Sequence, residues 1–393
     1  MQKRFAPDEG GTFPEWEEVT LGDIAEFSRG KGLTKKDVFK KGKRKCLLYG
    51  QLQVRYGTVI KNVTGMTDVE LKNPVLSKSG DVLISGTISA GLAKASCIKE
   101  DGVIIGGDIN ILRPKEGIDG EFLARAINAN TKKFKRFLEG SVILHLKNEN
   151  IKEVSIRIPK SIEEQRKIAA ALAAYDEMIA VKTAKLETWQ ECKKRMVKEI
   201  FGRTKRFRDD DGNEFPEWEE KMLGEVCKYG NTHKIGKNYI KVENMNKDFS
   251  GVTFLEPSLE RKGIVYDVGD VLMSNIRPYL RKAWLADRSG ICDSDVLVFH
   301  LKDGVDIDST FLYYTIASSE LVKWAMIGAR GTKMPRCDKQ HLLEKRIFLP
   351  CMTEQQKIGS FLAEIDKEIE IQKEFIKTYA EGKRRMMREL MEG

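Results

Sequence analysis

The sequence predicts a mixed α/β (α+β) protein in which one fold is present twice and each copy ends in a long helix. Three observations predict this fold class: a colinear internal repeat, a heptad pattern at the end of each repeat, and short apolar strands between turn residues. The predicted boundaries are a globular part and a helix at 1–160 and 161–202, then a second globular part and helix at 203–350 and 351–393.

The internal repeat is visible as matched segments in the same order. The segment Phe13–Glu18 (FPEWEE) recurs unchanged as Phe215–Glu220, at an offset of 202 residues. Further along, Gly80–Ser85 (GDVLIS) is matched by Gly269–Ser274 (GDVLMS) at an offset of 189, so copy two is 13 residues shorter in its early middle. Common surface phrases would not keep this order. A repeat of roughly 200 residues is long enough for a whole domain with an appended helix.

The two copies agree closely at their edges and barely agree in their middles, at 28–78 and 228–267. Apolar runs after the Gly-Asp turn of each copy predict short buried strands. Phe122–Phe137 and Phe311–Ile327 are predicted to be helical. In a duplicated binding protein, the shared edges would be scaffold and the divergent middles would be the surface that distinguishes ligands.

A capped amphipathic helix is predicted at the end of each copy. Ser161 and Thr353 each follow a proline, and Glu164 or Gln356 comes three residues later, which is the capping-box pattern. From there the apolar residues recur in steps of four and three, which predicts a heptad stripe. The stripe consists of Ile168, Leu172, Tyr175, Ile179, Leu186, Trp189, Met196 and Ile200, and then of Ile358, Leu362, Ile365, Ile369, Ile376, Tyr379, Met386 and Leu390. It is interrupted at matching places by Lys182, Lys193, Gln372 and Lys383.

Two helices of equal length and pattern in one chain most simply pack on each other as a coiled coil, because each alone would expose its apolar stripe to water. The alternative is that each helix packs on its own globular part. The narrow stripe, sustained over the whole helix, favours the coiled coil. Since each helix begins where its globular part ends, an antiparallel coiled coil would place the two globular parts in a pseudo-twofold arrangement.

Basic residues concentrate in the divergent middle of copy one. Between Arg29 and Lys61 there are eleven Lys or Arg and one acid, Asp37, with Tyr and Gln interleaved. Lys and Arg suit phosphate contacts, whereas Gln, Arg and Tyr can address base edges; the alternative is a solvated basic loop. The predicted DNA-contact residues of copy one are Lys31, Lys35, Lys36, Lys43, Arg44, Lys45, Gln51, Arg55, Tyr56 and Lys94. Those of copy two are Lys237, Tyr239, Lys241, Asn244, Asn275, Arg277, Tyr279, Arg281, Lys282, Arg330 and Lys333.

The overall composition fits a cytoplasmic protein with a polyanionic partner. The net charge is +9 and the pI is about 9.0. No apolar run approaches the roughly 18 residues that span a membrane, and the start of the chain lacks the apolar region of a signal peptide. The seven cysteines are scattered and never form CxxC, which fits a reducing compartment without disulfides.

Sequence signatures of catalysis are scarce. There is no GxxxxGK[ST] phosphate loop and no GxGxxG after a strand, and the four histidines lack the spacing of metal ligands. We therefore expect no metal site, no cofactor and no catalytic residue in this chain. Asp68, Glu70 and Lys72 superficially match a nuclease core, but this short pattern is missing from copy two. A nuclease is thus the enzyme alternative.

A globular part followed by a long helix that opens with Pro-x(n)-Glu-Gln-x-Lys-Ile, both present twice, resembles the specificity (S) subunit of type I restriction–modification systems. The Phe-Pro-Glu-Trp-Glu segment followed by Leu-Gly-Asp/Glu is also typical of that family, as is Gly-Asp-Val-Leu-Ile/Met-Ser. The resemblance covers the whole chain. It implies that each globular part is a target recognition domain that reads one half of an asymmetric, bipartite site in double-stranded DNA.

The resemblance also implies that the helices are conserved spacer regions, which set the gap between the half-sites and dock two modification (methyltransferase) subunits. Restriction subunits, with translocase and nuclease activity, would join this core. The chain itself would be non-catalytic, and S-adenosylmethionine, ATP and magnesium would belong to its partners. The alternative is a stand-alone DNA-binding regulator of the same fold. The two surfaces are unequal, because the basic turn at Gly328–Lys333 corresponds to Gly140–Val142 in copy one.

Overall fold

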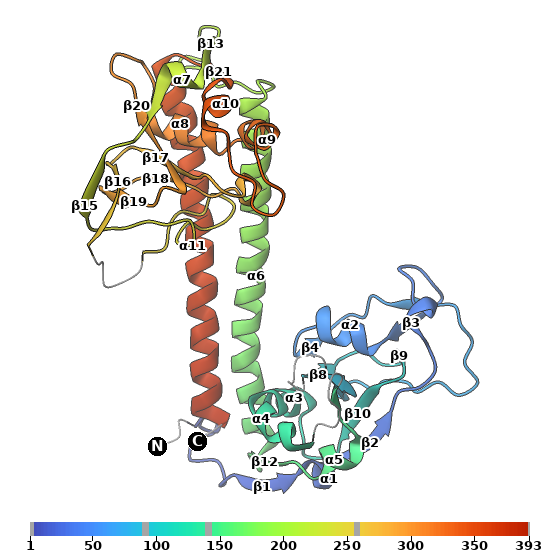
Figure 1. The fold of residues 1–393 in the computed structure, drawn as a ribbon. Coiled ribbons are helices and arrows are strands. Elements are labelled where there is room, and N and C mark those ends of the chain that lie inside the picture. The colour runs from blue at the N-terminus through green and yellow to red at the C-terminus, as the bar shows by residue number, and fades with distance from the viewer. Residues whose placement is uncertain (1–3, 89–93, 138–143, 255–259, 392–393) are drawn as a thin grey trace. The chain divides into compact units, whose positions relative to one another are not determined.

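The computed structural model describes residues 4–88, 94–137, 144–254 and 260–391 and divides the chain into two units. Unit 1 comprises Met1–Val181 and Phe375–Gly393, and unit 2 comprises Lys182–Glu374. Each unit holds one globular part and one stretch of each long helix (Figure 1), namely of α6 (Ile162–Phe201) and α11 (Met352–Met391). The turn at Gly140–Val142 lies outside the described residues.

The globular part of unit 1 is built on a sheet with the strand order β2-β10-β6-β8-β4. Its neighbours pair antiparallel except for β4 and β8, which are parallel. The strands are β2 (Ala25–Arg29), β4 (Val59–Ile60), β6 (Val82–Ser85), β8 (Ala95–Ile98) and β10 (Ile109–Pro114). Smaller sheets pair β5-β3-β9, β1-β12 and β7-β11, from β1 (Glu17–Thr20), β3 (Arg44–Leu47), β5 (Met66–Thr67), β7 (Thr87–Ile88), β9 (Ile104–Ile105), β11 (Leu144–His145) and β12 (Ser155–Ile158). The helices are α1 (Leu21–Ile24), η1 (Lys35–Asp37), α2 (Tyr49–Val54), α3 (Gly120–Ala129), α4 (Thr131–Phe134), η2 (Lys135–Phe137) and α5 (Asn148–Lys152).

The globular part of unit 2 repeats this plan with an antiparallel sheet of order β14-β20-β17-β18. Its strands are β14 (Cys227–Tyr229), β17 (Val271–Ser274), β18 (Ala283–Leu285) and β20 (Val296–Leu301). Two further sheets pair β15-β16-β19 and β13-β21, from β13 (Glu219–Met222), β15 (His233–Gly236), β16 (Arg261–Tyr266), β19 (Gly290–Cys292) and β21 (Arg346–Leu349). The helices are α7 (Leu223–Val226), η3 (Pro278–Leu280), α8 (Ser309–Ile316), α9 (Ser319–Ile327) and α10 (Lys339–Leu343).

The Gly-Asp pair before a central strand has the same role in both units. Gly80 and Gly269 have φ of +97° and +89°, a conformation that glycine adopts without steric cost. The carboxylate of the next residue, Asp81 or Asp270, accepts a hydrogen bond from a backbone N–H three residues earlier, at 2.8 and 2.6 Å. The four residues of β6 and of β17 are all buried, so the predicted short buried strands are confirmed here.

The predicted helices after β10 and β20 are each interrupted. Asn130 ends α3, and α4 begins at Thr131. In unit 2 the Ser318 hydroxyl accepts a hydrogen bond from the Leu321 N–H and starts α9 directly after α8. The two segments are helical as predicted, but each is divided, because a polar side chain at the interruption competes for backbone hydrogen bonds.

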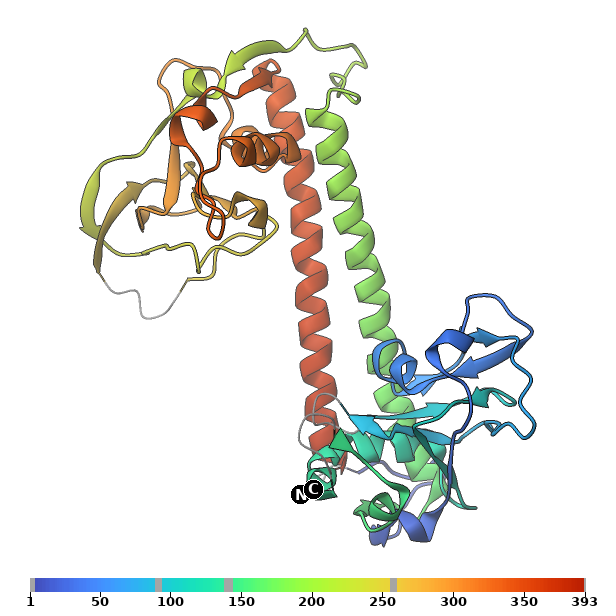
Figure 2. The same cartoon turned by 45° about the vertical axis from the view of Figure 1, so that its right-hand side comes forward.

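The two long helices run antiparallel within each unit. In unit 1 the early α6 residues Ile168 and Leu172 share a buried cluster with Leu390 and Met391, at the end of α11. In unit 2 the pairing is reversed: the late α6 residues Met196 and Ile200 share a cluster with the early α11 residues Ile358, Leu362, Ile365 and Ile369. Both views show the paired stretches side by side (Figures 1 and 2).

The same buried clusters include residues of the globular parts. Phe122 of α3 and Ile156 of β12 join the cluster of unit 1, and Phe311 of α8 and Leu349 of β21 join that of unit 2. The stripe therefore packs both on the other helix and on the globular core, so the two packing alternatives coexist. The remaining stripe residues are partly buried, namely Tyr175, Ile179, Leu186, Trp189, Ile376, Tyr379 and Met386.

The lysines that interrupt the stripe form ion pairs between the helices. In unit 2, Lys193 of α6 lies 2.5 Å from Asp366 of α11. In unit 1, Lys383 of α11 pairs with Asp176 of α6. These are equivalent positions of the two copies with the helices exchanged, which is the pattern that an antiparallel pair of duplicated helices produces.

The Glu-Gln pair at the start of each long helix anchors the helix to its globular part. The Glu164 side chain is fully buried and accepts hydrogen bonds from Arg4 and the Trp16 indole. Equivalent bonds join Glu354 to Arg206 and Trp218, both at 2.9 Å. The capping-box prediction was wrong for α11, which begins at Met352 and places Thr353 inside its first turn.

The described residues contain no helix that is long and apolar enough to cross a membrane. All seven cysteines are free. Burial raises the pKa of Cys97, Cys227 and Cys292 to about 12, so these side chains are protonated thiols at neutral pH and are poor nucleophiles.

Candidate DNA interface

The basic segment of unit 1 lies along η1 and β3. Four of the predicted contact residues, Lys31, Lys35, Lys36 and Lys43, are exposed. The Asp37 carboxylate accepts hydrogen bonds from the Thr34 N–H and hydroxyl, which fixes the turn that carries two of these lysines. The segment thus presents a run of exposed ammonium groups on an ordered backbone, which suits phosphate contact.

Other predicted residues of unit 1 are engaged inside the unit. Lys45 pairs with Glu100 and donates to Asn62 at 2.9 Å. Lys94 donates to the Tyr56 carbonyl, and burial lowers the pKa of Lys94. The Gln51 side chain accepts a hydrogen bond from the Leu48 N–H at 3.0 Å and so helps to start α2. Arg55, just past the end of α2, is exposed, whereas Arg44 is half-buried.

In unit 2 the structure brings together two segments that are far apart in the sequence. The Arg277 N–H donates to the Pro335 carbonyl at 2.7 Å, and Ile276 forms an isolated bridge with Arg336. Arg336 is in turn bridged to Arg330. The predicted residues of the loop 275–282 therefore lie beside the predicted residues Arg330 and Lys333, both of which are exposed.

Sequence reasoning missed Arg336 in this arrangement. Its guanidinium donates to both carboxylate oxygens of Asp295, at 2.5 and 3.3 Å, and the Asp295 carbonyl accepts from the Asn275 N–H. Arg336 thus ties the two segments to the sheet. The local sequence does not distinguish Arg336 from the basic residues near it, because its partner Asp295 lies 41 residues away.

The remaining predicted residues of unit 2 differ in accessibility. Lys237 is exposed and Lys241 is half-buried. The Tyr239 hydroxyl donates to Asp293 at 2.7 Å, and burial together with this carboxylate raises the pKa of Tyr239 to about 12. Asn244 is buried, with its side chain bonded to the backbone of Lys241 and Thr253. Asn244 therefore belongs to the fold and is left out of the proposed interface.

The nuclease alternative finds no support in the described residues. Their carboxylates, histidines and cysteines form no group of three or more that could hold a metal ion. The Asp68 carboxylate accepts a hydrogen bond from the Lys43 N–H at 2.8 Å, so it holds the chain next to β3.

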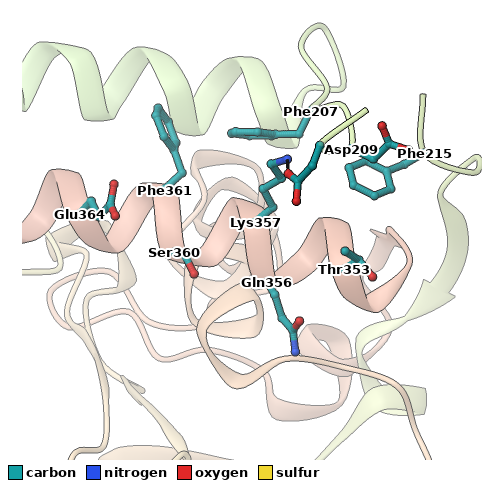
Figure 3. A pocket seen from close by; sticks show the side chains of 10 residues that line it. Phe207, Asp209, Phe215, Thr353, Gln356, Lys357, Ser360, Phe361 and Glu364 are labelled. Atoms are coloured by element: carbon teal, nitrogen blue, oxygen red, sulfur yellow. Dashed lines mark hydrogen bonds and ion pairs between the residues drawn. The ribbon is translucent and has the colours of Figure 1, made fainter. Parts of the chain in front are cut away.

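A cavity of about 530 Å³ in unit 2 lies beside the first turns of α11. The residues that line it belong to other parts of the sequence than the basic segments described above. Phe207, Phe215 and Phe361 contribute to its lining (Figure 3). Lys357 donates to Asp210 and to the Arg208 carbonyl. Lys167 makes the corresponding bonds to Asp8 and the Ala6 carbonyl in unit 1. The repeated contacts indicate that this region fastens the start of each copy to its helix.

Residues 14–188 and 216–378 match the family model described as the type I restriction modification DNA specificity domain. The chain belongs to this family. The two matched ranges follow the two copies of the repeat, and the predicted resemblance to specificity subunits is confirmed.

Relatives named as type I restriction enzyme specificity subunits match all or part of the chain. The chain is 24% identical over 423 aligned residues to the type I restriction enzyme MjaVIII specificity subunit of Methanocaldococcus jannaschii, covering 100% of this chain and 96% of that protein. It is 25% identical over 279 residues to the type I restriction enzyme EcoDI specificity subunit of Escherichia coli, covering 61% of each.

Two solved structures share the fold of this chain. The S subunit of the type I restriction–modification system from M. genitalium superposes with a TM-score of 0.66 at 14% identity, covering 98% of this chain and 99% of that one. A chain from a study of complex assembly and conformational transition of the type I R-M system superposes with a TM-score of 0.54 at 18% identity, covering 97% and 98%. The predicted two-domain α/β fold is confirmed.

Proposed function

We propose that this chain is the non-catalytic subunit that gives a type I restriction–modification complex its DNA sequence specificity. Each globular part contacts one half of a bipartite, asymmetric site in double-stranded DNA. The observation that carries this proposal is a shared scaffold with unlike surfaces. Both units use the same Gly-Asp turn and the same buried Glu anchor, yet unit 1 exposes lysines at η1 and just before β3, whereas unit 2 exposes Tyr279, Arg330 and Lys333.

Duplicated protein units with different surfaces suit a DNA site whose half-sites differ. Phosphate contacts by exposed Lys and Arg position a protein on DNA, and base contacts select the sequence. Because the scaffolds are equivalent, the two units can approach DNA in the same way. Because their loops differ, they would select different bases.

The long helices supply the other part of the proposal. They act as a spacer between the half-sites and as the docking surface for two modification subunits, with restriction subunits joining this core. In support, the relatives are named specificity subunits of restriction enzymes. S-adenosylmethionine, ATP and magnesium would then be bound by the partner subunits, and the chain itself would bind none of them.

The decisive experiment maps methylated adenines in the genome of a cell that carries the cognate modification subunit, with and without this chain. We expect one bipartite motif to be methylated only when the chain is present. Absence of any chain-dependent motif would refute the proposal. If the purified chain nevertheless selected a bipartite duplex, the stand-alone regulator would become the better interpretation.

A further inference from the structure

The loop that follows β17 leaves the scaffold of unit 2 at the same point as the loop that follows β6 in unit 1. The residue directly after the strand makes two backbone hydrogen bonds. Its N–H donates to a carbonyl just before the next central strand, and its own carbonyl accepts from an N–H later in the chain. These bonds are Gly86 to Asp108 and Leu146 to Gly86 in unit 1, and Asn275 to Asp295 and Cys337 to Asn275 in unit 2, all at 2.8 or 2.9 Å. The scaffold is therefore constant where the side chains diverge.

Left-handed backbone is concentrated around the loop of unit 2. Eight non-glycine residues of the described chain have positive φ, and four of them meet here, at +51° to +57°: Asp248, Phe249, Arg277 and Arg281. The Phe249 N–H donates to the Arg281 carbonyl at 2.7 Å, so the two pairs are in contact. Such conformations are unfavourable for L-residues and persist only where the surroundings enforce them, most often at functional sites.

Several charged side chains of the loop are occupied in holding its shape. The Arg281 guanidinium lies 4.9 Å from the centroid of the Phe249 ring. The Lys282 ammonium donates to the Val242 carbonyl at 2.7 Å, and burial lowers the pKa of Lys282. These contacts make the loop rigid before any ligand binds, which reduces the entropy lost on binding.

The rigid loop exposes one side chain. Tyr279 is 48% exposed at the centre of η3, whereas Pro278 beside it is buried. Within the same loop, the buried Asn275 Oδ1 and Arg277 Nε have no hydrogen-bond partner. A tyrosine hydroxyl both donates and accepts hydrogen bonds, so an exposed one can address the polar atoms of a base edge. The neighbouring Lys333 is exposed and supplies positive charge for DNA phosphates. The Arg330 guanidinium is also exposed, although it lies 3.0 Å from the Asp338 carboxylate.

We propose that Tyr279 contacts a base and determines the sequence preference at that position of the half-site bound by unit 2. The strained backbone at Arg277 and Arg281 holds Tyr279 outward, and the surrounding basic side chains bring the duplex to it. This inference rests on the proposed function and names the residue through which one unit distinguishes base pairs.

The test is a binding selection with the full-length chain and its Tyr279→Ala variant, each incubated with a duplex library whose centre is randomised. Bound duplexes are sequenced. We expect the wild-type chain to select two half-sites at a fixed gap. The variant should lose discrimination about 5- to 150-fold at one or two adjacent positions of one half-site, the range expected for one base contact. The other half-site and the gap should not change.

The matched control is Val268→Ala, which removes an exposed apolar side chain at the opposite end of β17 and should leave the selected motif unchanged. If Tyr279→Ala selected the wild-type motif with full discrimination, this inference would be overturned and the proposed function would stand. If the variant lost both half-sites and unfolded at a lower temperature, Tyr279 would be a structural residue, and the inference would again fail. A wild-type chain that selected no bipartite motif would overturn the proposed function and this inference together.

Discussion

Lys193 of α6 and Asp366 of α11 form an ion pair at 2.5 Å, and Asp366 also accepts a hydrogen bond from the Tyr314 hydroxyl of α8 at 2.7 Å. One carboxylate therefore joins the two long helices and the globular core of unit 2. In unit 1, Asp176 has the same role: it pairs with Lys383 and accepts from Arg125 at 2.8 Å. The interruptions of the heptad stripe are thus points that fix the alignment of the helices.

Replacing Asp366 should destabilise unit 2 more than replacing its lysine partner. Burial and the adjacent carboxylate raise the pKa of Tyr314, so its hydroxyl stays a donor that needs an acceptor. We expect Asp366→Ala to cost about 1 to 3 kcal/mol in the free energy of unfolding and Lys193→Met to cost less. Urea denaturation measures both. Lys367→Met, an exposed lysine on the same helix, is the control, and equal losses in all three variants would contradict the assigned role.

Exposed lysines of unit 1 should contribute to DNA affinity without contributing to sequence preference. We expect the triple variant Lys35→Ala, Lys36→Ala, Lys43→Ala to bind duplex DNA more weakly, because each lost phosphate contact reduces counterion release. The slope of log affinity against log salt should become shallower by about 0.9 per lost contact. Fluorescence anisotropy over a salt series measures this slope.

A control for this effect removes the same charge elsewhere. Lys132, Lys185 and Lys198 are exposed on α4 and α6, so their triple alanine variant should leave the slope close to that of the wild type. Equal changes in both triple variants would indicate a general effect of net charge. Lys45 is excluded from the test because its pairing with Glu100 would confound affinity with folding.

The bond between Tyr239 and Asp293 predicts a pH-dependent contribution to stability. The hydrogen bond from the Tyr239 hydroxyl holds the pKa of Asp293 below its ordinary value of 3.8. A carboxyl group whose pKa is lower in the folded state stabilises that state at pH values above the unfolded-state pKa. This stabilisation is lost as the pH falls through the folded-state pKa. We expect Tyr239→Phe to cost about 1 kcal/mol at neutral pH, with the two stabilities converging as the pH falls below the ordinary Asp pKa of 3.8.

Denaturation at a series of pH values tests this expectation. The control is Tyr229→Phe, since the Tyr229 hydroxyl donates to the Lys339 carbonyl, which does not titrate. The cost of that substitution should be independent of pH. A Tyr239→Phe penalty that persisted unchanged into acid would show that Asp293 is not the acceptor that matters.

Lengthening the helices should alter the spacing of the DNA site and leave its half-sites intact. Insertion of one heptad into α6 and one at the matching place in α11 preserves the apolar stripe and adds about 10 Å of helix. We expect the accepted gap to grow by about three base pairs, given about 3.4 Å per base pair. Methylation mapping with the altered chain measures the gap. A changed half-site sequence would contradict the assignment of the helices as spacers.

The sequence by itself determined the duplication, the two long helices and the family, because these depend on matched segments and on periodicity. Heptad spacing predicts an amphipathic stripe wherever it occurs. The tertiary structure decided what the polar residues do. Glu164, which local spacing predicted as a helix cap, is a buried acceptor for Arg4 and Trp16, more than 140 residues away.

The same limit applies to the predicted interface. A lysine that faces solvent, such as Lys35, and one that pairs with a distant carboxylate, such as Lys45, have identical local patterns. Only folding brings residues 275–282 beside 335–337 and forces Arg277 and Arg281 into the left-handed region. Local propensity disfavours that backbone, so only contacts between residues distant in the sequence can select it. The resulting loop leaves Tyr279 exposed.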